Sequence, residues 1–185
     1  MNRTLAVIFV LTAALALSAA GWAQNDPIGK TDTVTLVVET IQPGKWVVTT
    51  YVWNDEELGG VGIPLKYTAG VATLGVDSVV YTGTRMETFA KTYDQVDTVN
   101  QMIHFGGFPY MSPDQPPMPP GNGEMARIYI SVTGEKKPSA FAIDTTTMKP
   151  NNSLMLVDKT AKIIVPALKI VYADKQKAEQ AEKKK

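Results

Sequence analysis

Apolar and polar residues alternate along most of this chain, which is the pattern of β-strands that bury one face. The clearest stretch is Lys45–Trp53, KWVVTTYVW, which is almost entirely β-branched and aromatic. Val61–Tyr67 alternates as well, and its odd-numbered positions are all apolar. No interior window has good helical periodicity. The pattern therefore predicts an all-β protein.

Short strands separated by turn residues follow one another over the rest of the chain. We expect them at Thr31–Glu39, Val71–Leu74, Asp77–Thr84, Glu87–Tyr93, Gln101–Phe105, Glu124–Val132, Ser139–Asp144, Leu154–Asp158 and Ala161–Tyr172, the last broken by Pro166. About nine strands over residues 32–172 predict a two-sheet sandwich of the jelly-roll or immunoglobulin-like kind. A closed barrel is the alternative, and the uneven strand lengths and a long proline loop favour the sandwich.

Two segments interrupt the strands. We interpret Asn54–Tyr67, NDEELGGVGIPLKY, as the corner where the chain leaves one sheet and enters the other. Within it, Pro64 cannot donate to a β-ladder, which indicates a bulge or an edge position. Pro109–Gly123 holds six of the twelve prolines, so we expect a stiff, extended loop.

The two ends of the chain have compositions of their own. Arg3, an apolar stretch from Leu5 to Ala20 and small residues before Gln24 predict a signal peptide over residues 1–23, followed by a polar leader over 24–31. Residues 173–185 carry five lysines and three acids and predict a flexible tail. An electrostatic tether to an anionic surface is the alternative for the tail. We expect a protein that is secreted, periplasmic or on the cell surface.

Charge and cysteine content narrow the function classes. The 18 basic and 18 acidic residues balance, so nothing in the composition favours nucleic-acid binding. Cysteine is absent, which excludes thiolate metal sites and thiol nucleophiles. The single histidine, His104, has no serine and acid at a spacing that suggests a triad. We therefore expect no enzyme activity, no cofactor and no metal site.

Three consecutive acids, Asp55–Glu57, stand at a strand end. Paired carboxylates across a cleft can hydrolyse glycosides, but adjacent acids on a turn should splay into solvent. Weak calcium binding is the remaining alternative, because oxygen ligands suffice for that ion.

Several strands in order resemble cohesin-type domains. The opening TVTLVVE, then WVVTTYVWND and LGGVGIPLKYTAGVATLGVDSVVYTGT, and later GEMARIYISVTG and SAFAIDTT, carry the likeness over roughly Asp32 to Val171. The resemblance implies a nine-stranded jelly-roll sandwich related to certain carbohydrate-binding modules. It also implies a non-catalytic binding role, commonly toward the dockerin modules of secreted enzymes.

The expected partner surface follows from this resemblance. Glu124–Val132 corresponds to a strand of the sheet that cohesins use for binding, and alternation turns Met125, Arg127, Tyr129 and Ser131 outward. We expect Lys66 and an outward-facing His104 on strands of the same sheet. We therefore predict Lys66, His104, Arg127 and Tyr129 as the face that contacts a secreted or surface protein.

Two aromatic residues suggest an alternative ligand. Tyr51 and Trp53 lie two positions apart on one predicted strand, so both point the same way, about 6.6 Å apart along it. Flat aromatic faces at that spacing could stack two rings of a polysaccharide. Trp46 has the opposite parity, which predicts a core position. The alternative function is therefore a carbohydrate-binding module.

Overall fold

The computed structural model describes residues 29–109, 112–150 and 152–174. The signal peptide predicted over residues 1–23, residues 24–28 of the leader and the tail from Lys175 lie outside these ranges. Within them, no helix is both long and apolar enough to cross a bilayer. The described residues form eleven strands in two sheets, so the predicted fold class, an all-β sandwich, is confirmed.

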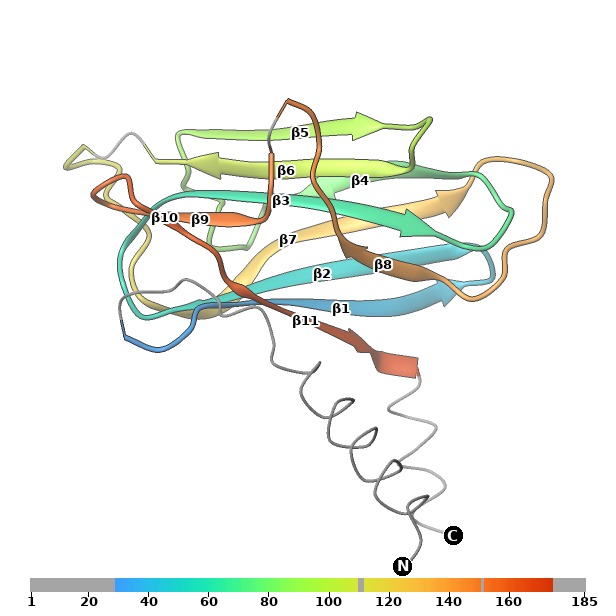
Figure 1. The fold of residues 1–185 in the computed structure, drawn as a ribbon, viewed down its shortest axis with the longest axis horizontal. Helices are drawn as coiled ribbons and strands as arrows, with labels where there is room; N and C mark the ends of the chain where they lie inside the picture. Colours follow the sequence, from blue (N-terminus) through green and yellow to red (C-terminus); the bar gives the residue numbers. More distant parts are fainter. Residues whose placement is uncertain (1–28, 110–111, 151, 175–185) are drawn as a thin grey trace, which may run out of the picture.

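The two sheets lie face to face with their long strands running in similar directions (Figure 1). Sheet A has the order β11–β1–β2–β7–β4, with β1 at Thr33–Gln42, β2 at Lys45–Asn54, β4 at Leu74–Val80, β7 at Gly121–Val132 and β11 at Ala167–Tyr172. Sheet B has the order β10–β9–β3–β6–β5, with β3 at Leu58–Thr68, β5 at Lys91–Asp97, β6 at Met102–Phe108, β9 at Met155–Asp158 and β10 at Ile163–Ile164. A further strand, β8 at Ala142–Thr145, pairs with β3.

The structure has more strands than the nine expected, and some boundaries differ. Residues 161–172 form two strands in different sheets, with Pro166 in the link between them. Conversely, the two short strands expected over Val71–Thr84 are one, β4. The strand expected at Glu87–Tyr93 begins only at Lys91, because the amides of Glu87 and Phe89 are held in turns by the carbonyls of Thr84 and Met86.

The core consists of the inward-facing residues of the alternating strands. Leu36, Val48 and Ile128 from sheet A are fully buried, and so are Ile63 and Phe105 from sheet B. At one end of the core, Trp46 stacks on Phe141 with ring centroids 4.8 Å apart. Trp46 is only 6% exposed, which confirms its predicted core position.

The corner predicted at Asn54–Tyr67 is confirmed, since β2 ends at Asn54 in sheet A and β3 begins at Leu58 in sheet B. The buried amide group of Asn54 donates to the carbonyl oxygen of Glu56, 2.6 Å away. This bond closes the turn at the point where the backbone leaves sheet A. The Asn54 side chain therefore satisfies the Glu56 carbonyl, which lies between two strands and has no partner in a β-ladder.

Pro64 lies inside sheet B, so the bulge or edge position expected for it is wrong. On one side β3 pairs with β6 from Val61 to Lys66, including Pro64 with His104. On the other side it pairs with β9 as far as Gly62 and with β8 from Leu65 onward. The carbonyl of Pro64 accepts from Thr146 in this gap between two partner strands. The missing N–H of proline therefore costs the sheet no ladder bond.

Candidate functional site

The four residues predicted as one contact face lie on opposite sides of the sandwich. Lys66 is on β3 and His104 on β6, both in sheet B, whereas Arg127 and Tyr129 are on β7 in sheet A. The expectation of a common sheet is wrong because β7 pairs with β2 and β4. Each pair points away from the core on its own sheet. The molecule therefore presents two separate outer faces.

His104 has the predicted parity, but it is buried. Its side chain is on the outer side of β6 and yet only 4% exposed. The neighbouring outward positions are Gly62 and Gly106, which leave room for side chains to lie flat on the sheet. The Tyr93 hydroxyl lies 3.2 Å from His104 Nε2, and the two rings meet edge to face. The solvent-facing histidine expected from alternation is therefore wrong.

Burial of His104 makes the stability of the fold depend on pH. Burial lowers the pKa of His104 below its usual 6.5, so the unfolded chain takes up a proton before the folded one as the pH falls. We expect the free energy of unfolding to decrease between pH 7.5 and 5.5, measured by urea titration. His104 is the only histidine, so His104→Gln should flatten this dependence. An equal slope in the variant would contradict the assignment.

A β-bulge changes the predicted outer face of β7. The register with β2 shifts between Thr50 and Tyr51, which face Ala126 and Glu124, so Met125 is the extra residue. Met125 is fully buried instead of outward-facing. Ser131 is 8% exposed and donates to Asp77 Oδ1 at 2.7 Å. Of the four residues expected outward on this strand, Arg127 and Tyr129 remain partly exposed.

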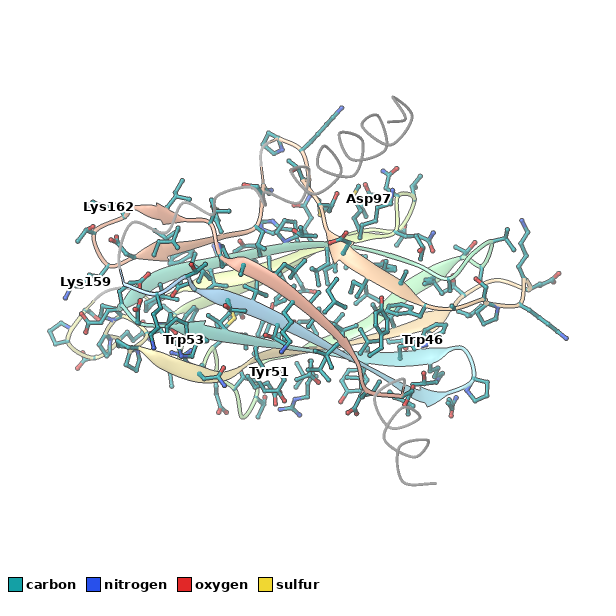
Figure 2. The ribbon with its side chains drawn as sticks, turned by 60° about the horizontal axis from the view of Figure 1, so that its bottom comes forward. Trp46, Tyr51, Trp53, Asp97, Lys159 and Lys162 are labelled. Carbon is teal, nitrogen blue, oxygen red and sulfur yellow. The ribbon has the colours of Figure 1, made fainter. Side chains whose placement is uncertain are left out.

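The outer face of sheet A joins residues that the sequence analysis assigned to two different ligands. Tyr51 and Trp53 point outward from β2, and each is partly exposed. Tyr51 pairs with Glu124 on β7, and the next outward pair along the strands is Thr49 with Arg127. Arg127 forms an ion pair with Glu124 and donates to the Thr82 carbonyl. In Figure 2, Tyr51 and Trp53 lie along the same strand of this face.

The outer face of sheet B carries a row of apolar side chains that alternation alone did not single out. Ile163 on β10 pairs with Val157 on β9, which pairs with Gly60 on β3. One residue beyond the Val61–Gly107 pair, the register puts Gly60 opposite Phe108. Ile163 is 63% exposed and Phe108 42% exposed, and Val157 is half-buried. We call Ile163, Val157 and Phe108 the apolar row.

A cleft opens on the same face toward its other end. The segment after β8 crosses sheet B, where Thr146 donates to Pro64 and its hydroxyl approaches the sulfur of Met102 (Figure 1). Between this segment and the β5–β6 turn is a cleft of about 720 Å³. Its lining is largely polar and includes Gln95, Asn100, Thr147 and Lys149.

The acids at the corner are more ordered than expected. Asp55 accepts a hydrogen bond from the Lys30 amide at 2.8 Å, and this bond lowers the pKa of the Asp55 carboxyl. Glu57 forms an ion pair with Lys159. Asp32, Asp55 and Glu56 can each bring one carboxylate oxygen within 4.8 Å of the others. Asp55 is exposed, as predicted for an acid on a turn, but the predicted splaying into solvent is wrong for Glu56, whose carboxylate is buried, and for Glu57, which is ion-paired. An acidic trio alone does not define a metal site.

Comparisons with known proteins identify the fold. No protein-family model matches the chain, and no curated protein matches it in sequence. Solved structures of cohesins do share its architecture. One is a chain of a type I cohesin–dockerin complex from Clostridium thermocellum, with a TM-score of 0.57 and 11% identity over 78% of this chain and 96% of that one.

Two further structures come from Acetivibrio cellulolyticus. The sixth cohesin of scaffoldin B, in complex with a Cel5 dockerin, has a TM-score of 0.55 and 11% identity over 77% of this chain and 99% of that one. A type II cohesin domain from the cellulosome has a TM-score of 0.53 and 14% identity over 77% and 92%. The described sandwich therefore has the cohesin-type fold, as the resemblance implied.

Proposed function

We propose that this cohesin-type sandwich is an exported, non-catalytic module that binds a protein partner through the outer face of sheet B. The predicted signal peptide supports export. Structures with this fold have been solved as complexes with dockerins, so dockerin modules are the first partners to test. Fold likeness alone carries little weight for function. The choice of sheet B rests on the surface itself.

The apolar row is the observation that carries the proposal. Folded proteins seldom leave large apolar side chains exposed side by side, and where they do the surface commonly contacts another molecule. Ile163 and Phe108 are the most exposed apolar residues on the strands of sheet B, and Val157 lies between them in the register. Burying such a row against a partner removes apolar area from water, which is the main driving force for association.

The surroundings of the apolar row suit a flat protein interface. Gly60, Gly62 and Gly106 have no side chains, so Tyr93 and Met155 can lie close to the sheet beside them. Such side chains are already ordered and lose little entropy on binding. Lys66 and Lys91 are exposed on the same face and form a polar rim. A central apolar region inside a polar rim is the usual anatomy of an interface.

Replacing the two exposed residues of the apolar row should strongly weaken partner binding. We expect the double variant Phe108→Ser/Ile163→Ser to bind at least tenfold more weakly, since central apolar residues dominate interface energies. The measurement is affinity capture from secreted and envelope fractions, followed by titration of the captured protein by calorimetry. The matched control is Val71→Ser/Val99→Ser, which removes two more exposed aliphatic side chains, at 73% and 88% exposure, from turns that lie outside the apolar row. Equal binding by both double variants would refute the proposal.

The originally predicted contact residues take different roles in this proposal. Lys66 would contact the partner directly, whereas the buried His104 would act by positioning Tyr93. Arg127 and Tyr129 lie on sheet A and would contribute nothing to this interface. Tyr51 and Trp53 are also on sheet A, so a carbohydrate bound there would leave the partner face open.

A further inference from the structure

We infer that the outer face of sheet A binds an extended, uncharged polysaccharide along a track of three aromatic side chains, Trp53, Tyr51 and Tyr129. This inference goes beyond the proposed function and does not depend on it, because the two faces belong to different sheets. It also joins Tyr129, predicted for a protein partner, with the aromatic pair predicted for sugars.

The track follows the central strands of sheet A. Trp53 and Tyr51 are successive outward residues of β2, and Tyr129 on β7 pairs with Val47 of β2. From Trp53 to Val47 the strand advances six residues, or about 20 Å. All three aromatic side chains are partly exposed. Their flat faces can therefore pack against the apolar faces of pyranose rings over a length that suits several sugars, not one.

Hydrogen-bonding side chains flank the first two aromatic rings on both sides. Thr33 of β1 pairs with Trp53, and Thr35 pairs with Tyr51. On the β7 side, Asn122 pairs with Trp53 and Glu124 with Tyr51. Adjacent strands are about 4.8 Å apart, so these groups lie beside the rings, where the equatorial hydroxyls of a stacked sugar would project. Aromatic faces with polar flanks are what distinguish a sugar platform from an ordinary apolar patch.

The charges of this face favour an uncharged ligand. The basic residues Lys45, Lys169 and Arg127 are balanced by three acids on the same side of the sheet, Glu39, Glu124 and Asp77, the last of which accepts a hydrogen bond from Ser131. Arg127 and Glu124 also neutralise each other in an ion pair. No excess of one sign is available to attract a polyanion. A neutral chain with flat rings, such as a β-linked glucan or mannan, suits the surface better than an acidic one.

The track ends beside a hollow of about 370 Å³. Tyr129 forms part of its wall, together with Gln42, Lys45, Asp77 and Ser78. These residues offer hydrogen-bond donors and acceptors at the end of an otherwise flat surface. The hollow could take a side branch or the end of the chain. Tyr129 would then contact the ligand both at the end of the aromatic track and in the wall of the hollow.

The test uses the purified protein with cellohexaose and mannohexaose as neutral probes and polygalacturonate as the acidic one, measured by calorimetry. We expect binding of at least one neutral chain, and at least tenfold weaker binding by Tyr51→Ala/Trp53→Ala. Trp53→Phe keeps an aromatic face and should retain most of the affinity. Phe108→Ser/Ile163→Ser, altered only on sheet B, should bind the sugar as the unaltered protein does. Circular dichroism confirms that each variant is folded.

Two outcomes would overturn the inference. In the first, neither neutral chain is bound, whether or not polygalacturonate is bound. In the second, the folded Tyr51→Ala/Trp53→Ala variant binds a neutral chain as well as the unaltered protein does. Loss of protein capture in that same variant, without any sugar binding, would assign the face to a protein instead. The sugar-binding results leave the sheet B proposal untouched, because its own variants do not alter sheet A. Loss of protein capture in the sheet A variant would count against that proposal as well.

Discussion

Gly106→Ala should be among the most damaging single substitutions in this protein. We expect it to lower the free energy of unfolding by about 3 kcal/mol or more, a large share of the stability of an ordinary domain. A Cβ added at Gly106 would overlap the carbonyl oxygen of Val61 on the neighbouring strand. It would also lie 2.9 Å from the Tyr93 hydroxyl, closer than real Cβ atoms come to other atoms.

The expected loss of stability is large because the added Cβ would overlap a backbone atom and not only a side chain. A flexible side chain can turn away from a new methyl group, but the Val61 carbonyl is fixed within the β3–β6 ladder. Relief would require the two central strands of sheet B to separate. The Tyr93–His104 contact above the glycine would be displaced as well. One methyl group therefore disturbs both the sheet and its outer surface.

Gly60→Ala is the matched control for this substitution. Gly60 is on β3 in the same sheet, and its added Cβ would meet the Val157 side chain no closer than 3.5 Å, an ordinary contact. Since alanine is about 0.5–1 kcal/mol better than glycine inside a strand, this variant should be neutral or slightly more stable. Urea titration followed by tryptophan fluorescence compares the two. Equal midpoints would show that β3 and β6 are not packed as described.

The face to which each strand residue points was predictable from the sequence, and so were the core residues on that face. Val61, Ile63, Leu65 and Tyr67 were assigned to one face, and all four are at most 4% exposed. This works because alternation is a local property that needs only the chain itself. The corner at Asn54 was predictable for the same reason, since the pattern breaks at consecutive acids followed by glycines.

Sheet membership was not predictable in the same way. The predicted contact face was wrong because β7 was assigned to the sheet of β3 and β6. Instead, β7 pairs with β2, which lies about 75 residues earlier in the chain. The pairing of β1 with β11 is longer in range still, and parallel. Such choices depend on which strands can cover each other's apolar faces. Alternation within one strand holds no information about its neighbour.

The solvent exposure of outward-facing side chains was also not predictable from the sequence. His104 has outward parity, yet the adjacent glycines let Tyr93 and Met155 lie beside it on the sheet. Met125 was assigned outward because nothing local marks the bulge that turns it inward. In each case the outcome is set by residues on a neighbouring strand. Parity gives the direction of a side chain, but packing decides whether solvent reaches it.

The same reasoning explains why the two proposed surfaces can be tested separately. Their side chains point away from a core made of both sheets, which are about 10 Å apart in such packings. A substitution on an outward position of sheet A changes no contact on the outer face of sheet B. A protein partner and a polysaccharide could therefore be held at once, which would make the module a bridge between them.

Arg85→Met should be the most damaging substitution outside the core. Arg85 lies in the turn between β4 and β5 and was not singled out by its sequence context. Its Nη1 donates to the carbonyls of Val52 and Gly121 and to Asn54 Oδ1, at 2.9–3.1 Å. Its Nη2 donates to the Pro119 carbonyl. The side chain thus ties the end of β2 to the proline-rich loop, and partial burial lowers the pKa of Arg85 without removing its charge.

Methionine keeps the length of the side chain but supplies no donor, so four acceptors lose a partner together. Hydrogen bonds to a charged group contribute about 1.5–3 kcal/mol each and are not additive here, so we expect a loss of about 3 kcal/mol in the free energy of unfolding. The loop should also become easier to cut, because the bonds that still tie its described residues 112–120 to the sandwich are those between Met118 and Leu58 and one from Asn54 to Pro119. Limited proteolysis should then cleave the variant between Pro109 and Gly121 faster than the unaltered protein.

Arg127→Met is the control that separates this network from the general effect of removing an arginine. Arg127 is partly exposed, and its ion pair with Glu124 lies at the surface, where such pairs contribute little. We expect a much smaller change in the denaturation midpoint and unchanged cleavage of the proline-rich loop. If the two variants lost stability equally, or if only Arg127→Met exposed the loop, the clamp assigned to Arg85 would be wrong. A large loss with Arg85→Met alone would show that one partly buried guanidinium holds the loop onto the sandwich.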